Sequence, residues 1–577
     1  MPNAGTSHRQ AGSCLDKRAA ATWTVLEHLF FLRGQGPCAA KVSGVRQRPL
    51  ALAQPVSHFD NATMKRQRFV PQGSLSRMFQ EAAEAWKRQD YQQSIETLER
   101  AAKLDPANPR IHLDLGRAYG MRYDYPKAED CLEKAIRVAS PKLEALSEAG
   151  KRCQQFGRPE MATRYFERAA QEKGVTTEVF VKLAEISERR ARLDEAREFV
   201  ERALKLDPNY PPARLVRARL DRFSGRLGEA ESQVRALVNS ATSDPWWGEC
   251  WYELAEILDR LARYDEAMEA LLEAKALVRP AVTHYSATLQ RVQERLRALE
   301  TTITASVLER WAAAAESLQP LQLFSILCGH PRSGTTLLEQ VLDSHPSILT
   351  AEETHILHDE AYLPLSRGFS PEASVLEVLE SAPVSRLRQS RENYFHFTEL
   401  YLGATRGDKM LVDKNPALSS LIPAAARIFP EAKFLVALRD PRDVCLSCFM
   451  QSLSPNPISS SYLSLEGTVT QYLSVMGFWR TLLPRLRNPF LEVRYEELVD
   501  DLEGTSRKVL NFLGVPWDER VMRFDEHARS KSLGSPSYAE VTKPISKRAI
   551  GRWQNYRRYL EPYLERLEPM LKTLGYV

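Results

Sequence analysis

Two patterns of polar and apolar positions divide the chain. Over residues 75–280, short phrases built around a small residue return at near-constant intervals, which is typical of a helical repeat array. From residue 321 onward, short apolar runs are followed by tight loops and then by helical segments. The two patterns predict an α-solenoid followed by an α/β domain with a parallel sheet over residues 321–577, and a helical linker over 281–320.

The repeat is anchored by a small residue in the phrases YQQS, YPKA, PEMA, LDEA, LGEA and YDEA. Successive anchors are 34, 34, 34, 34 and 37 residues apart, and they stand at Ser94, Ala128, Ala162, Ala196, Ala230 and Ala267. Positions seven residues after and twelve residues before each anchor are also small, except Leu237. Small side chains are needed where two helices of one repeat, and the next pair, cross closely.

This register resembles the tetratricopeptide family, and the resemblance implies about six helix pairs. Aspartate-proline pairs at Asp105, Asp207 and Asp244 are expected to end the second helix of a repeat, because proline lacks an amide donor. Arrays of this kind are curved binding surfaces, so we expect a protein or peptide partner. The alternative is a set of unrelated amphipathic helices.

The distribution of charged residues along the chain narrows the kinds of molecule that we expect the protein to bind. The chain carries 79 Lys and Arg against 74 Asp and Glu, a net charge of +5. Residues 1–70 alone contain ten basic and three acidic side chains, so the excess belongs to this segment. We therefore predict no nucleic-acid partner for the rest of the chain. No apolar run approaches the roughly 18 residues of a membrane helix, so we expect no membrane span.

Residues 1–70 are predicted to be a poorly ordered basic tail, since they lack periodicity and contain Gly, Pro and scattered arginines. Two explanations stay open. The segment resembles a transit peptide in its many arginines and few acids, or it is an upstream extension and translation starts at Met64.

The cysteines predict reduced thiols. The chain has only eight, and several lie inside apolar runs, including Cys131, Cys250 and Cys328. Cys445 and Cys448 form a CxxC pair, but no second pair stands at zinc-site spacing, so we interpret them as ordinary helix residues. Together with the absence of a long apolar run, this usage predicts a cytoplasmic protein.

A phosphate-type loop begins the C-terminal domain. The predicted strand Phe324–Cys328 leads into Gly329-His-Pro-Arg-Ser-Gly-Thr-Thr336 and then a helix, so backbone amides and a helix start converge on one anion site. The loop lacks the Walker lysine, because Thr335 follows Gly334 and the cation is Arg332, before the glycine. A guanidinium can hold a terminal oxyanion in bidentate fashion without a metal.

The phrase PRSGTT resembles the 5′-phosphosulfate loop of sulfotransferases, whose donor is 3′-phosphoadenosine 5′-phosphosulfate. In that family an arginine at a strand end and a serine eight residues later bind the 3′-phosphate. Arg439, after the predicted strand Lys433–Leu438, and Ser447 have this spacing. Two alternatives remain: a Walker B element ending at Asp440, or an arginine that merely caps a strand of an ordinary α/β unit.

Three further segments narrow the resemblance. They are Leu349–Thr354, Val412–Pro416 and Ser537–Pro544, the last followed by Ile550-Gly-Arg-Trp553. Their order and spacing are similar to those of tyrosylprotein sulfotransferases over residues 321–577. The resemblance implies a sulfotransferase that needs no metal and acts on an acceptor hydroxyl, plausibly of protein tyrosine presented by the repeats.

The resemblance also implies residue roles. The 5′-phosphosulfate would be held by Arg332 and the amides of Ser333, Gly334, Thr335 and Thr336. Glu353 would be the general base, and Lys414 and Ser537 would stabilise charge on the bridging oxygen. The 3′-phosphate would be held by Arg439, Ser447 and Arg552, and Tyr495 would pack near the nucleotide. Sulfuryl transfer, like phosphoryl transfer, depends mainly on positioning and on neutralising the leaving oxygen, which suits these residue types.

Two positions depart from the tyrosylprotein pattern. Arg552 stands where those enzymes have lysine, and His355 replaces an arginine two residues after the base. The acceptor therefore stays open between tyrosine and a carbohydrate, lipid or phenolic molecule. Two further alternatives are that Glu353 is an ordinary helix-start acid and that the domain is an inactive nucleotide-binding scaffold.

Overall fold

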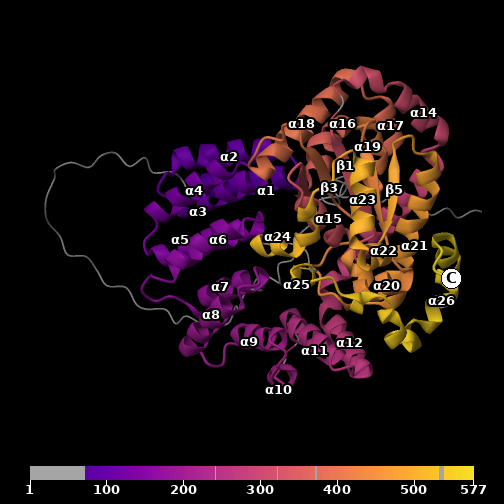
Figure 1. Ribbon diagram of the computed structural model, residues 1–577. Coiled ribbons are helices and arrows are strands. Elements are labelled where there is room, and N and C mark those ends of the chain that lie inside the picture. The colour runs from indigo at the N-terminus through magenta and orange to yellow at the C-terminus, as the bar shows by residue number, and fades with distance from the viewer. Residues whose placement is uncertain (1–71, 241, 243, 321, 371–372, 532–537) are drawn as a thin grey trace, which may run out of the picture.

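The computed structural model describes residues 72–577 except 241, 243, 321, 371–372 and 532–537. The predicted tail, residues 1–70, lies outside this range. A curved array of helices forms the N-terminal part, and an α/β domain with a parallel sheet forms the C-terminal part beside it (Figure 1). The predicted fold class is therefore confirmed.

In the described residues, twelve helices form the array, and consecutive helices pack against each other in pairs. They are α1 (Gln72–Lys87), α2 (Tyr91–Leu104), α3 (Pro109–Met121), α4 (Tyr125–Val138), α5 (Lys142–Gln155), α6 (Pro159–Ala169), α7 (Thr177–Arg189), α8 (Leu193–Leu206), α9 (Pro211–Phe223), α10 (Leu227–Val238), α11 (Gly248–Arg260) and α12 (Tyr264–Val282). Six predicted repeats thus correspond to six observed helix pairs.

The small columns lie at the helix crossings, as the spacing predicted. All six anchor residues are buried, with exposed fractions between 0% and 2%. A methyl group added at Gly116 would lie 2.7 Å from Leu132 Cδ2, and one added at Gly150 would lie 2.7 Å from the Phe166 ring. Real carbon contacts are longer, so a methyl group at either glycine requires the facing side chain to shift, and residues larger than alanine do not fit.

The aspartate-proline prediction is right at two positions and wrong at the third. Asp105 and Asp207 are the C-terminal caps of α2 and α8. In contrast, α10 ends at Val238, well before Asp244. Asp244 Oδ1 instead accepts a hydrogen bond of 2.8 Å from the Trp246 amide and starts a 3₁₀ helix (Pro245–Trp247). Proline is favoured at the first position of a helix, where no amide donor is needed.

Residues 281–320, expected to be a helical linker, contain α13 (Ser286–Thr302) and α14 (Ala305–Ala313). Leu299 and Trp311 from these helices belong to the same buried cluster as Phe324 and Phe434 of the sheet. This segment is therefore packed into the core of the α/β domain.

Within the part of the chain that the structure describes, five parallel strands form the sheet in the order β2-β3-β1-β4-β5. In chain order they are β1 (Phe324–Gly329), β2 (Ile348–Glu352), β3 (Met410–Lys414), β4 (Lys433–Leu438) and β5 (Phe490–Arg494). The predicted strands Phe324–Cys328 and Lys433–Leu438 are observed as β1 and β4. Along β1, Ile326 and Cys328 pack into one apolar cluster and Leu327 into another. Helices cover both faces, which explains the uninterrupted apolar run.

The helices of the α/β domain lie between the strands in the chain and, at the C-terminal end, after β5. They are α15 (Thr335–Asp343), α16 (Leu363–Ser366), α17 (Val375–Glu380), α18 (Val384–Leu402), α19 (Ile422–Ile428), α20 (Pro441–Met450), α21 (Leu465–Leu482), α22 (Tyr495–Asp500), α23 (Leu502–Leu513), α24 (Phe524–Ser530), α25 (Tyr538–Val541) and α26 (Arg557–Leu574). Among the residues described, none of the helices is both long and apolar enough to cross a membrane.

The array contacts the α/β domain near both of its ends. Near the first repeats, the Tyr91 hydroxyl donates a hydrogen bond of 3.3 Å to Asp359 Oδ2, and Arg122 pairs with Glu360. At the last repeat, Leu258 shares a buried cluster with Phe449 of α20 and with further aromatic residues that precede α26. Between these contacts, side chains of α7 and α9 and of the α/β domain line a common cavity.

Candidate active site

The site is built at the carboxyl edge of the sheet. One side chain comes from directly after each strand, or from its last position: Arg332 after β1, Glu353 after β2, Lys414 at the end of β3, Arg439 after β4 and Tyr495 after β5. Because parallel strands all end at the same edge, residues distant in sequence meet there. Each of the five is among the residues predicted from the sequence.

The loop after β1 depends on two glycines with left-handed backbone. Gly329 has a φ of 134° and Gly334 a φ of 95°. A methyl group on Gly334 would lie 2.6 Å from Tyr495 Cδ2, so the Tyr495 ring packs directly against the loop. Helix α15 starts at Thr335, and its first amides therefore face the loop with the positive end of the helix dipole.

Three arginines gather beside this loop. Arg332 Nε donates a hydrogen bond of 3.1 Å to Ser447 Oγ, and Arg439 Nη1 donates one of 3.1 Å to the carbonyl oxygen of Arg332. Burial lowers the pKa of Arg332, and the neighbouring cations Arg439 and Arg552 lower it further. Cations held together against their mutual repulsion form a site for a multiply charged anion.

Arg439 supplies a second sign that an anion belongs here. Its side chain is 7% exposed, and its Nε has no hydrogen-bond partner among the described residues. The guanidinium carbon lies 4.9 Å from the centre of the Tyr495 ring. A buried, unsatisfied donor is costly, so this group fits a phosphate that would accept from it.

Lys414 forms the centre of a second cluster, in which three carboxylates surround one ammonium group. Its Nζ lies 2.8 Å from Glu353 Oε1, 3.2 Å from Glu339 Oε2 and 3.6 Å from Glu352 Oε1. The Lys414 side chain has no exposed surface. Burial alone would lower the pKa of Lys414, but the three carboxylates raise it above its ordinary value. Lys414 is therefore a fixed positive charge at the end of β3.

Glu353 is the most accessible carboxylate of this cluster. Its side chain is 29% exposed, compared with 16% for Glu352 and 1% for Glu339. Glu353 has a φ of 47°, and its amide donates a hydrogen bond of 2.7 Å to the Lys414 carbonyl oxygen. The residue thus sits in a strained turn after β2 rather than at a helix start, the alternative suggested by its acidic neighbour.

Glu339 was missed by the sequence reasoning. It lies on α15, and burial raises its pKa well above the ordinary value, in spite of Lys414. The available signal was an acidic residue inside the mostly apolar run Leu337–Leu342, directly after the phosphate-type loop. Its contact with Lys414 could not be read from the sequence, because the two residues are on different elements.

Arg552 is brought to the arginine cluster, but it also has a partner in the array. Arg552 Nη2 lies 2.8 Å from Asp259 Oδ2 of α11, and its Nε donates a hydrogen bond of 3.3 Å to Asp259 Oδ1. The array residue was not among those predicted. Ser537, predicted to stabilise the bridging oxygen, lies outside the described residues.

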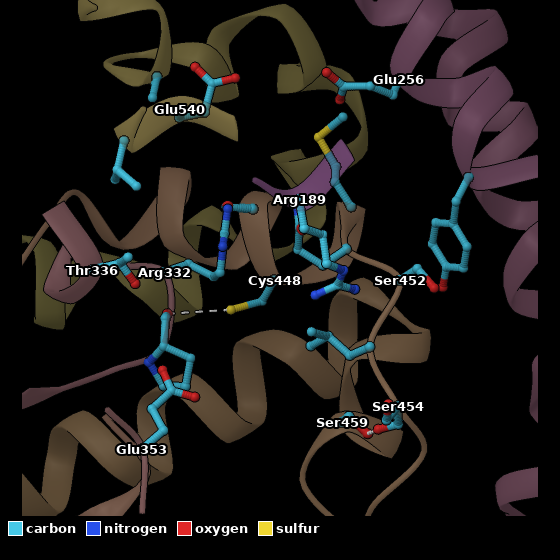
Figure 2. A pocket seen from close by; sticks show the side chains of 18 of the residues that line it. Arg189, Glu256, Arg332, Thr336, Glu353, Cys448, Ser452, Ser454, Ser459 and Glu540 are labelled. Atoms are coloured by element: carbon cyan, nitrogen blue, oxygen red, sulfur yellow. Dashed lines mark hydrogen bonds between the residues drawn. The ribbon is translucent and has the colours of Figure 1, made fainter. Parts of the chain in front are cut away.

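A cavity of about 840 Å³ joins the two parts of the protein. Figure 2 shows Arg189 and Glu256 of the array lining the same pocket as Arg332, Thr336 and Glu353. On the array side many of the charges are paired, as in the 2.5 Å contact between Arg222 Nε and Glu253 Oε1. The array wall is thus close to neutral, whereas the loop end of the cavity concentrates arginines.

The two cysteines of the CxxC pair are buried residues of α20, as interpreted from the sequence. Cys448 Sγ donates to the Pro331 carbonyl oxygen over 3.6 Å (Figure 2). Burial raises the pKa of Cys448 to about 12. Within the part of the chain that the structure describes, no three His, Cys, Asp or Glu side chains are grouped to hold a metal ion.

The fold and the site together define an α/β domain with a glycine-containing loop and a cluster of arginines at the ends of parallel strands. Residues 326–519 match the model of the sulfotransferase family. Residues 86–121, 177–220 and 248–277 match models of tetratricopeptide repeats. The chain therefore combines tetratricopeptide repeats with a sulfotransferase domain.

Comparison with known proteins adds relatives for both parts. Protein-tyrosine sulfotransferase 1 of Danio rerio is 27% identical over 254 residues, which is 43% of this chain and 70% of that protein. An uncharacterized protein of Aquifex aeolicus is 24% identical over 421 residues, which is 70% of this chain but only 51% of that protein's length. Among solved structures, the sulfotransferase domain of the Synechococcus PCC 7002 olefin synthase is 19% identical, with a TM-score of 0.29, and the match covers 40% of this chain and 86% of that one.

Proposed function

We propose that the protein transfers a sulfuryl group from 3′-phosphoadenosine 5′-phosphosulfate to a tyrosine hydroxyl of a protein or peptide that the repeats present. The observation that carries this proposal is the arrangement at the sheet edge. A cluster of arginines beside an anion-binding loop lies in the same cavity as an accessible carboxylate paired with a buried lysine. The curated relatives of the C-terminal region are named as protein-tyrosine sulfotransferases.

The donor would supply an activated sulfuryl group on a phosphate leaving group. Arg332 and the first amides of α15 are suited to hold the 5′-phosphosulfate, because both present N–H donors to an oxyanion. Arg439, Ser447 and Arg552 are suited to the 3′-phosphate. Tyr495 packs against Gly334 and Arg439 and would support the nucleotide at the rim of the loop.

Glu353 would accept the proton of the acceptor hydroxyl. A carboxylate is a much weaker base than a phenolate, so the proton must move as the new O–S bond forms. The bond between sulfur and the bridging oxygen breaks in the same step, and adenosine 3′,5′-bisphosphate leaves. Lys414 is the fixed charge that would neutralise this oxygen.

The 2.8 Å contact between Lys414 and Glu353 has a consequence for this step. While the Glu353 carboxylate is bound to the Lys414 ammonium, the carboxylate is directed at the ammonium and not at the acceptor hydroxyl, and the ammonium is partly neutralised. Binding of donor and acceptor would separate the two groups: Glu353 would turn to the acceptor hydroxyl and receive its proton, and Lys414 would stay in place for the bridging oxygen. Glu339 and Glu352 would keep Lys414 charged and in place during this exchange.

Two observations favour a polypeptide acceptor. The cavity extends from Glu353 to side chains of α7, α9 and α11, so an acceptor bound at Glu353 would lie beside the array. Tetratricopeptide repeats generally mediate protein interactions, and three segments of this array match the family models. The acceptor would therefore lie along the array with its hydroxyl at the sheet edge.

The proposal is tested by incubating the full chain with labelled donor and a tyrosine-containing peptide library, followed by mass spectrometry of the products. We expect label on tyrosine, in amounts that depend on the donor. Label on serine, on added carbohydrate or phenol only, or on nothing at all would contradict the proposed acceptor or the proposed reaction.

A matched pair of variants tests presentation by the repeats. Arg189→Ala alters a cavity-lining residue of α7, whereas Arg192→Ala alters an arginine outside the cavity whose side chain is 56% exposed. We expect only the first variant to raise KM for peptide acceptors, without a change in KM for a small phenol. If both variants behave like the parent with every peptide, this part of the array does not present the acceptor.

A further inference from the structure

The last helix pair of the array contacts the predicted donor site through one aspartate. Asp259 of α11 is 4% exposed and accepts hydrogen bonds or ion pairs from three residues that precede α26 in the sulfotransferase domain. The contacts are 2.6 Å from Arg548 Nη2, 2.8 Å from Arg552 Nη2 and 2.7 Å from the Tyr556 hydroxyl. The Asp259 carboxylate thus contacts three side chains of one segment, which lies about 290 positions further along the chain.

The same segment is held from its other side by the sulfotransferase domain itself. Asp443 of α20 accepts hydrogen bonds of 2.7 Å from the Gly551 amide and 2.8 Å from the Trp553 amide. Arg439 Nη2 donates one of 2.5 Å to the Ala549 carbonyl oxygen. These bonds fix the backbone of the segment, but they leave the direction of the Arg552 side chain to its contact with Asp259.

Rotamer freedom is the physical reason that this contact matters. A free arginine side chain loses rotamer entropy when a ligand orders it, and one that is already held in place loses less. Asp259 contacts Nε and Nη2, which are two of the three nitrogens of a guanidinium that has five N–H donors. A phosphate can therefore bind Arg552 without displacing Asp259. Burial would lower the pKa of Arg552, and Asp259 offsets this, so the charge is retained.

We propose that Asp259 of the repeat array is a positioning residue for the 3′-phosphate site: it orients Arg552 toward the cavity and so makes donor binding depend on the docked array. This inference rests on the proposed function, because it requires that Arg552 meet the donor. It assigns to the array a part in donor binding in addition to acceptor presentation.

The chain offers a matched control for this residue. Asp265 of α12 also pairs across the boundary, with Arg558 Nη2 at 2.7 Å and with the Tyr559 hydroxyl at 3.1 Å. Its side chain is 57% exposed, and neither it nor Arg558 lines the cavity. Asp259→Ala and Asp265→Ala therefore remove the same kind of contact between the two parts, once beside the arginine cluster and once away from it.

The test is calorimetric titration of the full chain with adenosine 3′,5′-bisphosphate and with adenosine 5′-monophosphate, which lacks the 3′-phosphate. We expect Asp259→Ala to weaken bisphosphate binding about tenfold, a usual size for residues that share one network. Binding of the monophosphate should not change, and Asp265→Ala should match the parent for both ligands. In an Arg552→Ala background, Asp259→Ala should have no further effect on the bisphosphate.

Asp259→Asn serves where the alanine variant does not fold, since it retains the volume and an acceptor oxygen and should lose less affinity. Unchanged or tighter bisphosphate binding in both Asp259 variants would overturn the inference while the proposed function stands. Equal losses for bisphosphate and monophosphate would also overturn it, because they would show a general structural defect. A parent protein that binds neither ligand would overturn the proposed function and the inference together.

Discussion

The array and the sulfotransferase domain differ in how their charged side chains are arranged. In the array, ion pairs join neighbouring repeats about one period apart, as between Arg222 and Glu253 or between Arg263 and Glu231. In the sulfotransferase domain, Arg332, Arg439 and Arg552 come from distant segments and stand close enough that the other two lower the pKa of Arg332.

The difference shows what each part is built to do. A solenoid contacts itself only between neighbours, so its charges can be neutralised within the repeat register. A parallel sheet gathers the ends of distant strands, so it can hold like charges together for a ligand. Packing of the surrounding fold holds these arginines together against their mutual repulsion, and a bound anion would relieve that repulsion.

The largest expected effect comes from removing the proposed base. Glu353→Gln should lower kcat by about 10²–10⁴-fold, because general base catalysis is lost while the side-chain volume is kept. Glu352→Gln changes the adjacent carboxylate, which is further from Lys414, and should lower kcat much less. Steady-state kinetics measures kcat for both variants, and titration with the donor checks that each variant still binds it. Equal losses would show that the pair acts together rather than through Glu353.

The second prediction concerns the stability effect of replacing Gly329 in the sulfotransferase domain, for comparison with a glycine of the array. A methyl group at Gly329 would lie 2.5 Å from the Ala437 carbonyl oxygen of the neighbouring strand, and φ is 134°. Backbone cannot move aside as a side chain can, so Gly329→Ala should lower the free energy of unfolding by about 3–5 kcal/mol. Urea denaturation measures this, and a loss below about 1 kcal/mol would contradict the rigid contact.

The third prediction concerns Lys275, on the boundary between the two parts. Its side chain is 1% exposed and its Nζ lies 4.7 Å from the Phe449 ring centre, and burial lowers its pKa from 10.5 to about 7. The unfolded chain binds this proton up to higher pH, so parent stability should rise as pH increases from 7 to 10.5. Lys275→Met should stabilise by about 2–4 kcal/mol near pH 7 and remove that slope.

The control for Lys275 is Lys205→Met on α8, where the lysine is exposed. Denaturation at several pH values should show no such change for this variant. A parent protein with the same pH slope as Lys275→Met would mean that Lys275 keeps its ordinary pKa.

The smallest effect is expected in the array. Gly116→Ala places a methyl group 2.7 Å from Leu132 Cδ2, which is the flexible end of a side chain. Other repeats carry Ala82, Ala184, Ala218 and Ala255 in the same column. Alanine also favours the helix by about 1 kcal/mol, so the net change in unfolding free energy should stay within about 1 kcal/mol. A loss as large as that of Gly329→Ala would remove the distinction between the two parts.

Local patterns were sufficient for much of the fold. The small columns predicted the six helix pairs, and the apolar runs predicted β1 and β4, because helix crossings and two-sided burial impose their residue types directly on the sequence. The glycine-containing loop after β1 was also predictable, because its residues are continuous in sequence. Asp244 shows where such patterns fail, because an aspartate-proline pair can equally well start a short helix.

By itself, the sequence determined the order of two architectures, the residue types at the strand ends and the neutrality of the chain beyond residue 70. Only the tertiary structure decided that Glu339 joins Lys414, that Asp259 of the array holds Arg552 and that both parts line one cavity. Those contacts join residues on separate elements, and nothing in the spacing along the chain encodes them. They arise when α15 packs against the sheet and when the array docks on the sulfotransferase domain, because both steps bury polar groups that must then be paired.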